Sequence, residues 1–501
     1  MGLNVTYKGE QIARLMSDGK ATLKLAGKTC EGDIVLTYSG GAGGISGGAG
    51  GISGGTGGAG GTGGSSNSTG KDVVFYDSYD HSIVASYSAA AFAALSALPQ
   101  NPQHAGLTAQ GWNWTLEAAK AYAAKYGKLM IGQMFVTDDG KTRIHIHLEP
   151  GRTSPMLGAC VNGTVTVDWG DGSEPDILTG TSLTKIKWTN RHNYASDGDY
   201  VIALTVDGSM AFSGSTTGSN LVRFSSNSDR RNAGYVNSIK AVEIGNGVPD
   251  IGSYAFYGCY SLTGVTIPNG VSGPENYAFQ HCYNLRGITL PNGSARIGSY
   301  TFQNCYSLAY IAIPDGTETI ADSAFDNCQS LAVVMLPESI VSIGASTFNK
   351  CVNLVSAVIP DGVVTFSGNA FMDCYRLSGT TIPDSVITIG GYAFSNCHVL
   401  TSVTIKDGVT GIGSNSFNCC RCLTHITLPG SITSILGAAF QGCQSLAEVH
   451  ILAQTPPTAG NVIFNNAPDD FVIYVPQGTL EAYQAAAGWS TYADKMQEAS
   501  A

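Results

Sequence analysis

Apolar residues recur with a fixed period of 23 residues from residue 251 onward. Each period carries the pattern I-G-x-x-x-F-x-x-C-x-x-L-x-x-V-x-I-P, and the pattern returns nine times without insertion or deletion. Its Phe lies at Phe256, Phe279, Phe302, Phe325, Phe348, Phe371, Phe394, Phe417 and Phe440. One repeat of this length cannot bury its apolar face alone, so stacked repeats must share a continuous core. The pattern therefore predicts a solenoid of nine coils over residues 239–475 and a helical cap over 476–501.

The signature AF-x-x-C-x-x-L-x-x-V-x-I-P resembles that of BspA-like, or treponemal, leucine-rich repeats. The resemblance covers residues 239 to about 475, and the ending YVPQGTLEAYQAAAGW also matches that family. It implies that Leu, Val and Ile point inward, that Phe fills the convex side, and that Pro ends each strand.

Nine Cys share one phase of the repeat. We interpret them as small buried hydrophobes. A ladder of parallel side chains offers neither the clustered ligands of a zinc site nor the facing pairs of disulfides. Cys419 and Cys422 fall outside this phase, and we expect them to be exposed.

The first 70 residues differ in character from the repeats. Residues 1–38 contain two alternating runs around a Gly-Lys turn and predict an N-terminal β module for attachment. Residues 39–70 are rich in GGX triplets, which suit either a flexible linker or packed left-handed polyglycine helices. The second alternative loosely resembles the polyglycine bundles of one phage adhesin family.

Two domains are predicted between the glycine-rich segment and the solenoid. Residues 71–150 predict an α+β domain with helices at 88–98 and 115–126, and their run LPQNPQHAGLTAQGWNW resembles a domain of gut-phage tail and appendage proteins. Residues 151–208 resemble a PKD-type β-sandwich through WGDG at 169–172 and the run from His192 to Tyr194. Asp168 and Asp171 admit a calcium site, but two carboxylates are few, and a structural turn is favoured. Residues 209–238 are a polar connector.

Composition narrows the function classes. Charged residues make up 13% of the chain and its net charge is −11, which argues against nucleic acid and anionic membrane surfaces as partners. No run of 18 apolar residues occurs, so we expect no membrane insertion. The N-terminus lacks the apolar stretch of a signal peptide and the C-terminus lacks a hydrophobic tail, which favours a virion component over an exported protein.

The four variable positions between Phe and Leu of each repeat carry the best signal for binding. Several coils hold Tyr, Asn, Gln, His or Arg there, a set that resembles an antibody paratope. Because stacking places equal positions side by side, we hypothesise a recognition strip beside the strands, against the alternative of neutral drift in an exposed turn. Its candidate residues are Tyr257, Tyr260, Gln280, His281, Tyr283, Asn284, Gln303, Asn304, Tyr306, Gln329, Tyr375, Arg376, His398, Arg421 and Gln444. A second candidate is the open strand face, with Arg286, Tyr310, His425, Glu448 and His450.

Catalytic motifs are absent from the sequence: there is no nucleophile elbow, zinc-protease motif, phosphate loop or evident pair of glycosidase carboxylates. We therefore expect neither enzymatic activity nor a cofactor. One motif admits a metal, since His145 and His147 alternate on a strand and point to one face. In a trimer with that strand on its axis, these imidazoles would enclose a metal. Two surface His on an edge strand are the simpler reading.

Together these features predict a multidomain, mainly β protein that recognises a target without catalysis. The first reading is a phage tail fibre or appendage protein, whose N-terminus binds other virion tail proteins and whose solenoid adheres to a polysaccharide or protein receptor on a bacterial surface. A homotrimer is expected by analogy with tail fibres. The alternative is a bacterial cell-surface adhesin built from the same repeats.

Overall fold

The computed structural model describes residues 73–212 and 238–499, together with the strand backbones of 3–7, 10–15, 35–37, 214–215, 218–219 and 222–223. The chain divides into two compact units, Met1–Asn67 and Ser68–Ala501. In the first unit, β1 (Leu3–Tyr7) pairs antiparallel with β2 (Glu10–Leu15) and β3 (Val35–Thr37). The predicted Gly-Lys turn and the glycine-rich segment 39–70 lie outside the described residues.

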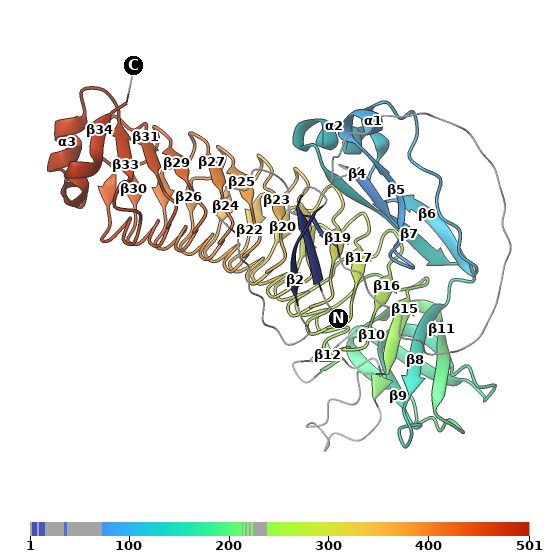
Figure 1. Cartoon of the computed structure of the whole chain (residues 1–501). Helices are drawn as coiled ribbons and strands as arrows, with labels where there is room; N and C mark the ends of the chain where they lie inside the picture. The colour runs from blue at the N-terminus through green and yellow to red at the C-terminus, as the bar shows by residue number, and fades with distance from the viewer. Residues whose placement is uncertain are drawn as a thin grey trace. The chain divides into compact units, whose positions relative to one another are not determined.

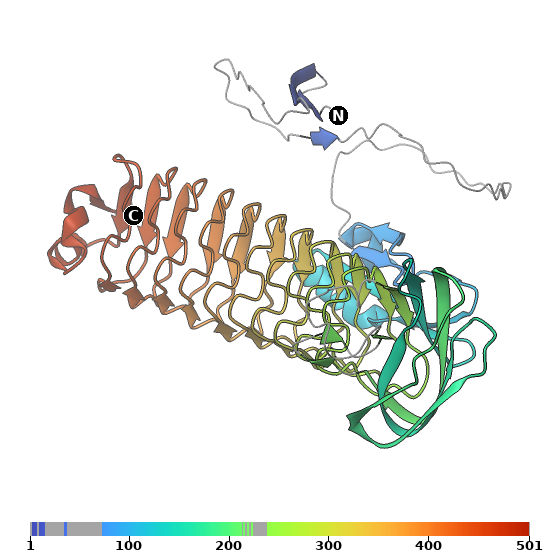
Figure 2. The same cartoon turned by 90° about the horizontal axis from the view of Figure 1, so that it is seen from below.

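Two rows of short parallel strands build the solenoid (Figure 1), and Figure 2 shows its coils side by side. The register follows the repeat, as in Ala241 opposite Gly264 and Gly411 opposite Ser434. The first row is β15 (Ile239–Glu243), β16 (Gly264–Thr266), β17 (Gly287–Thr289), β19 (Tyr310–Ala312), β21 (Val333–Met335), β23 (Ser356–Val358), β25 (Gly379–Ile382), β27 (Ser402–Ile405), β29 (His425–Leu428), β31 (Glu448–Ile451) and β33 (Val472–Val475). The second row is β18 (Arg296–Ile297), β20 (Thr319–Ile320), β22 (Ser342–Ile343), β24 (Thr365–Phe366), β26 (Thr388–Ile389), β28 (Gly411–Ile412), β30 (Ser434–Ile435) and β32 (Thr458–Ala459).

A column of phenylalanine rings runs through the core of the solenoid. From Phe256 to Phe464, successive rings stack with their centroids 5.0 to 5.6 Å apart. Every ring of the column is buried. The column confirms the predicted solenoid, because a ring that repeats every 23 residues meets its own equivalents in the neighbouring coils.

The repeat cysteines form a second buried column. The thiol of Cys282 donates to the carbonyl of Phe256 at 3.2 Å, and the same bond recurs along the column to that between Cys443 and Phe417 at 3.3 Å. Burial raises the pKa of these thiols, for Cys443 to about 12. All of them are free, which agrees with the interpretation as buried hydrophobes, whereas Cys422 is exposed and Cys419 is half-buried.

We expect iodoacetamide to modify Cys422 in the folded chain and to spare the nine column cysteines, because only an accessible, ionised thiol reacts. Peptide mass spectrometry after brief labelling measures this outcome. Labelling in guanidinium chloride is the control, since all of these cysteines should then react. Rapid modification of Cys305 or Cys351 in the folded chain would contradict a closed core.

A long antiparallel sheet precedes the solenoid and continues into it (Figure 1). Its strands are β8 (Thr142–Leu148), β9 (Met156–Asp168), β10 (Asp176–Trp188) and β11 (Gly198–Ala211), in the order β10-β9-β11-β8-β15-β16. The strand pair β12 (Gly214–Ser215) and β13 (Gly218–Ser219) and the strand β14 (Val222–Arg223), which pairs with β9, follow in the chain. Strands β9, β10 and β11 of the segment that resembles a PKD-type sandwich thus pair with one another in a single sheet.

Strand β8 covers the edge of the first coil by pairing antiparallel with β15. The sequence analysis grouped this strand with the α+β domain of 71–150. In the structure its apolar residues Ile144, Ile146 and Leu148 pack into the core that the sheet shares with the solenoid. The physical reason is that the first solenoid strand would otherwise present an unpaired edge.

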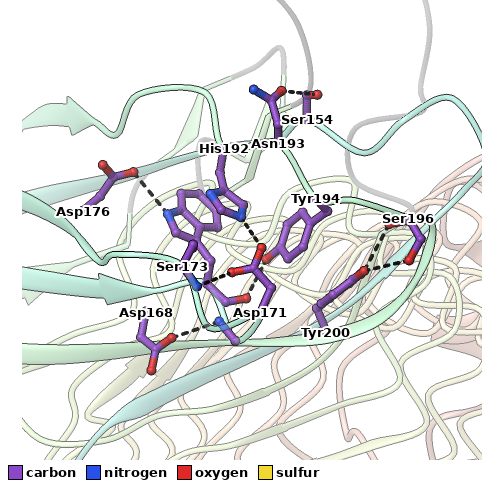
Figure 3. Close-up of polar contacts among 12 residues, drawn as sticks. Ser154, Asp168, Asp171, Ser173, Asp176, His192, Asn193, Tyr194, Ser196 and Tyr200 are labelled. Atoms are coloured by element: carbon purple, nitrogen blue, oxygen red, sulfur yellow. Dashed lines mark hydrogen bonds and ion pairs between the residues drawn. The ribbon is translucent and has the colours of Figure 1, made fainter.

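The WGDG turn is locked to the segment 192–194 (Figure 3). The rings of Trp169 and His192 stack with 4.6 Å between their centroids, and His192 Nε2 lies 2.8 Å from a carboxylate oxygen of Asp171. The Tyr194 hydroxyl donates to the Trp169 carbonyl at 2.8 Å. Asp168 and Asp171 each accept a backbone N–H two residues further on, at 3.0 and 3.1 Å. Both carboxylates therefore act within the turn, which was the favoured interpretation.

The α+β domain has a sheet with the strand order β5-β4-β7-β6. Its elements are β4 (Val73–Tyr76), β5 (Ile83–Tyr87), α1 (Ala89–Ala93), β6 (Leu107–Trp112), α2 (Leu116–Tyr126) and β7 (Leu129–Thr137). Helix α2 matches its prediction, with Thr115 as N-cap and Gly127 as left-handed C-cap. Helix α1 ends earlier than predicted. Its last residue is Ala93, and beyond it the carbonyls of Leu95 and Pro99 accept side-chain hydrogen bonds from Lys120 and Trp112.

The α+β domain docks on the strand row of the first coils through the end of its GWNW run. The side chain of Asn113 is fully buried, and its Nδ2 donates to the carbonyls of Leu290 and Ala312 at 3.2 and 3.1 Å. Its Oδ1 accepts the backbone N–H of Gly132 at 2.8 Å. One amide thus bonds both β7 and two solenoid coils.

Further side chains of this domain extend the contact. Trp114 and Tyr122 donate to two more solenoid carbonyls at 2.9 and 2.7 Å. Lys125 lies 2.8 and 3.2 Å from two solenoid carboxylates. A Cβ on Gly132 would come within 2.1 Å of Thr289, so glycine is required where β7 crosses β17.

The C-terminal cap closes the last coil (Figure 2). It comprises α3 (Leu480–Ala485), the 3-10 helix η1 (Ser490–Lys495) and β34 (Met496–Glu498), which pairs with β33. Tyr483 and Trp489 are buried and donate to solenoid carbonyls at 2.8 and 2.7 Å. The predicted helical cap thus contains one α-helix, and its C-terminal part is a 3-10 helix followed by a strand. None of the helices in the described part of the chain is long and apolar enough to cross a membrane.

Candidate recognition surface

Each coil turns at two positions with left-handed backbone, two residues before and two residues after its Phe. From residue 254 to residue 438 the non-glycine residues at these positions have φ between 55° and 65°. Such a conformation costs a residue with a side chain roughly 1–2 kcal/mol, and Gly, Asn and Asp tolerate it best. At the second position, most coils hold one of these three residues.

The first three coils place a tyrosine at the first of these positions. Tyr254, Tyr277 and Tyr300 stack with centroids 4.6 and 4.9 Å apart and rings within 4° of parallel. These rings are only half-buried, so the core gains little from residues placed in such a costly conformation. Every coil has this conformation at the first position, so the turn belongs to the repeat, and the stack of three half-exposed rings is what sets the first coils apart.

This ladder was not predicted from the sequence, because its residues lie outside the variable positions between Phe and Leu. The signal was nevertheless present, as Tyr recurs at a step of 23 residues immediately before the Ala-Phe or Thr-Phe pair.

A second ladder contains the tyrosines on which the predicted strip depended. Tyr260, Tyr283 and Tyr306 stack with centroids 4.7 and 4.8 Å apart. Their faces are turned to one another, so ring edges and hydroxyls remain for contacts with a ligand.

Two side chains join the ladders into one surface. Tyr257 lies 5.7 Å from Tyr254 and packs edge-on against His281 at 5.4 Å, and His281 packs edge-on against Tyr283 at 5.8 Å, all between ring centroids. We call this surface the tyrosine patch, and it consists of Tyr254, Tyr257, Tyr260, Tyr277, His281, Tyr283, Tyr300 and Tyr306.

In the tyrosine patch, burial favours the neutral forms of three tyrosines and of the histidine. Burial, followed by the neighbouring phenols, raises the pKa of Tyr257, Tyr277 and Tyr283. Burial lowers the pKa of His281. The surface therefore offers neutral hydroxyl donors and acceptors on rigid rings, which suits contact with a polar but weakly charged polymer.

Three predicted binding residues lie beneath the patch in a polar ladder between coils. Gln280 is 8% exposed and donates to Gln303, which donates to Asp326 at 2.7 Å. The amide of Asn304 lies 3.2 Å from His281 Nδ1. These amides bond one another across coils, so their hydrogen-bonding capacity is used within the solenoid.

Two other predicted residues are tied to the solenoid surface. Asn284 donates to the carbonyl of Tyr260 at 2.8 Å, and Gln329 donates to Asn327 at 3.0 Å. Both side chains are exposed.

The remaining predicted residues lie further along the solenoid. Tyr375 and His398 stack at 4.9 Å, and Arg376 lies 3.5 Å from an amide oxygen of Asn353. Arg421 and Gln444 are exposed. The structure thus separates these five residues from the patch by two coils, which carry Gln329 and Val352 at the Tyr260 position.

The two histidines of the predicted metal motif face solvent on one side of β8. His145 Nε2 lies 3.0 Å from Glu243 of β15, and His147 Nδ1 lies 2.8 Å from Asp199 of β11. Strand β8 lies between these two strands, so it is not the edge strand considered from the sequence. Each imidazole has its own carboxylate partner, and metal binding there stays a prediction.

A different group in the described residues brings three metal-type ligands together. Single ligand atoms of Asp77, Asp80 and His104 all lie within 4.8 Å of one another. His104 Nε2 is 2.7 Å from a carboxylate oxygen of Asp77, which is almost completely buried. His104 belongs to the LPQNPQHAG run, and its contact with Asp77 holds this run against the turn after β4.

The α+β domain covers part of the strand face that was the second candidate for binding. Tyr310, which the sequence analysis placed on it, is 5% exposed because the α+β domain covers it. Its ring stacks on Tyr76 at 4.0 Å. Further along, His425 and Glu448 remain exposed, and His450 stacks on Tyr474 at 4.5 Å.

The repeat region matches a known protein family. Residues 231–355 and 365–469 match the family model described as BspA type leucine rich repeat region. No curated protein shows significant sequence similarity to the chain.

Several solved structures are similar to part of the chain. A leucine rich cell surface protein from Faecalibacterium prausnitzii is 26% identical over 48% of this chain and 73% of its own, with a TM-score of 0.32. A leucine-rich repeat protein from Bacteroides ovatus is 23% identical over 51% and 83%, with a TM-score of 0.30. The T. pallidum leucine rich repeat protein is 26% identical over 37% and 78%, with a TM-score of 0.29. The repeat pattern, the stacked coils and the family match agree that the C-terminal part of the chain is a leucine-rich-repeat solenoid similar to the BspA type.

Proposed function

We propose that this chain is a non-catalytic recognition protein of a bacterial cell surface and that its tyrosine patch contacts the target. The observation that carries the proposal is the placement of eight aromatic side chains as one connected, half-exposed surface on three consecutive coils. Three of them occupy left-handed positions that do not favour tyrosine. A connected aromatic surface that adds little to the core is expected to serve binding.

For the cellular location we adopt the second interpretation of the sequence, that of a bacterial cell-surface protein. The BspA-type repeats support a surface repeat protein, and the similar Faecalibacterium protein is itself described as a cell surface protein. None of the similar proteins named above is described as part of a virion. The tail-fibre reading depends on features of the sequence, chiefly the resemblances of residues 39–150.

Replacement of Tyr260, Tyr283 and Tyr306 together by Ser tests the proposal. We expect the variant to lose target binding by roughly 100-fold, because central tyrosines carry much of the energy of such interfaces. The measurement is binding of the fluorescent full-length chain to a glycan array and to immobilised bacterial and host surface proteins, followed by titration of each ligand that the wild type binds.

Tyr392→Ser is the matched control, because Tyr392 is an exposed tyrosine at the Tyr254 position of a distant coil. It should bind like the wild type, and all three proteins should keep the same thermal unfolding midpoint to within a few degrees. Equal binding by the triple variant and the wild type would exclude the patch as the recognition surface.

A further inference from the structure

A cavity of about 810 Å³ lies where three parts of the second unit meet. The turn 78–81 of the α+β domain, the antiparallel sheet and the first solenoid coils all line it. Its volume falls within the usual range for small-molecule sites, about 300–1,000 Å³. The cavity is separate from the tyrosine patch, with which it shares no residue.

The floor of the cavity is one row of residues across four strands. Val201, His145, Ala241 and Gly264 lie opposite one another on β11, β8, β15 and β16. Two of these four are the smallest residue types, which creates the hollow in the middle of the sheet. A Cβ on Gly264 would lie 2.9 Å from His81 Nε2, so the glycine lets the turn approach the floor.

The turn that forms the opposite wall is held in place by His81. This residue has left-handed backbone, with φ of 65°. Its Nδ1 lies 3.0 Å from the Tyr310 hydroxyl and its Nε2 lies 3.1 Å from the Thr263 carbonyl. Burial lowers the pKa of His81, which keeps the imidazole neutral with one nitrogen for each partner. These hydrogen bonds therefore fix the position of the turn that forms this wall.

Two basic side chains, those of Lys240 and Arg286, line the cavity. Lys240 and Arg286 lie in one column with Thr263 between them, joined by backbone hydrogen bonds of 2.9 and 3.2 Å. Both side chains are exposed, and neither forms an ion pair with any residue that the structure describes.

The carboxylates at the cavity are already bonded. Glu243 contacts His145 at 3.0 Å, and Asp199 contacts His147 at 2.8 Å. Asp80 accepts a backbone N–H of its own turn at 2.9 Å. Lys240 and Arg286 have no ion-pair partner among the described residues, whereas these carboxylates are already hydrogen-bonded. This arrangement favours a ligand that carries one negative group and several polar groups.

We propose that this cavity binds a carboxylated sugar of one or two rings. The ligand carboxylate lies between Lys240 and Arg286, where it gains charge-assisted hydrogen bonds. The sugar hydroxyls face Glu243 and His145 on the floor, whose carboxylate and imidazole accept and donate hydrogen bonds. The exposed ring of Tyr79 offers an apolar face beside them. This site is independent of the target of the tyrosine patch.

Isothermal titration of the full-length chain with D-glucuronate and N-acetylneuraminate tests the proposal. We expect saturable binding of at least one of them with a Kd of about 1 mM or tighter. D-glucose, which lacks the carboxylate, and acetate, which lacks the sugar, should each bind at least tenfold more weakly. Absence of saturable binding by both sugar acids would overturn the proposal, as would equal affinity for either comparator.

Two variants locate the site. Arg286→Gln removes the guanidinium and should weaken the sugar acid at least tenfold, whereas Arg296→Gln, an exposed arginine of β18 that does not line the cavity, should leave its affinity unchanged. Ala241→Leu fills the floor and should abolish binding. An Arg286→Gln protein that melts like the wild type and binds the sugar acid equally well would overturn the assignment, even if Ala241→Leu fails to fold.

Discussion

Replacement of Phe348 by Ala is expected to destabilise the solenoid by about 3–5 kcal/mol. Phe348 is fully buried in the middle of the ring column, with its centroid 5.4 Å from that of Phe325 and 5.1 Å from that of Phe371. The neighbouring coils cannot collapse into the space, because backbone hydrogen bonds of 2.8 and 2.9 Å at Phe348 and Phe325 set their separation. The cost of the cavity is therefore added to the lost burial.

Guanidinium unfolding followed by circular dichroism measures this loss. Val341→Ala is the control, since Val341 is 48% exposed and its truncation should change the free energy of unfolding by no more than about 0.5 kcal/mol. Because coils contact mainly their neighbours, amide exchange should also accelerate most in the coils next to Phe348. A loss below about 1 kcal/mol would mean that the phenylalanine column is not the main core of the solenoid.

Replacement of Asn113 by Leu is expected to weaken the docking of the α+β domain by about 2–4 kcal/mol. Leucine has a similar size but cannot bond the carbonyls of Leu290 and Ala312 or the N–H of Gly132. Three buried backbone groups would then lack a partner, and each unsatisfied group is costly. The solenoid should remain folded, because its core does not include this residue.

Hydrogen exchange detects the change as faster exchange in β17 and β19. Gln103→Leu lies in the same sequence run but is exposed, and it should leave the exchange of both strands unaltered. Unchanged protection of β17 and β19 in Asn113→Leu would contradict the role of this amide in docking.

The repeat architecture could be predicted from the sequence because its contacts are periodic. A residue and its equivalent 23 positions later occupy the same place in adjacent coils, as the Phe and Cys columns show. The same logic predicted the neighbourhood of Tyr260, Tyr283 and Tyr306. It did not separate exposed rings from amides such as Gln280, because spacing alone does not tell which side of a turn a side chain faces.

Contacts outside the repeat had no periodic signal. The interface of Asn113 and Trp114 joins residues 177 to 199 positions apart, and it buries Tyr310 on a face that the repeats by themselves leave open. Likewise, β8 covers the first coil, which gives His145 and His147 separate carboxylate partners. Sequence periodicity by itself predicted the solenoid, its core and the column that holds Tyr260, Tyr283 and Tyr306. Tertiary packing decided which strands stay accessible and where the cavity forms, since both depend on the fit between surfaces that share no repeat.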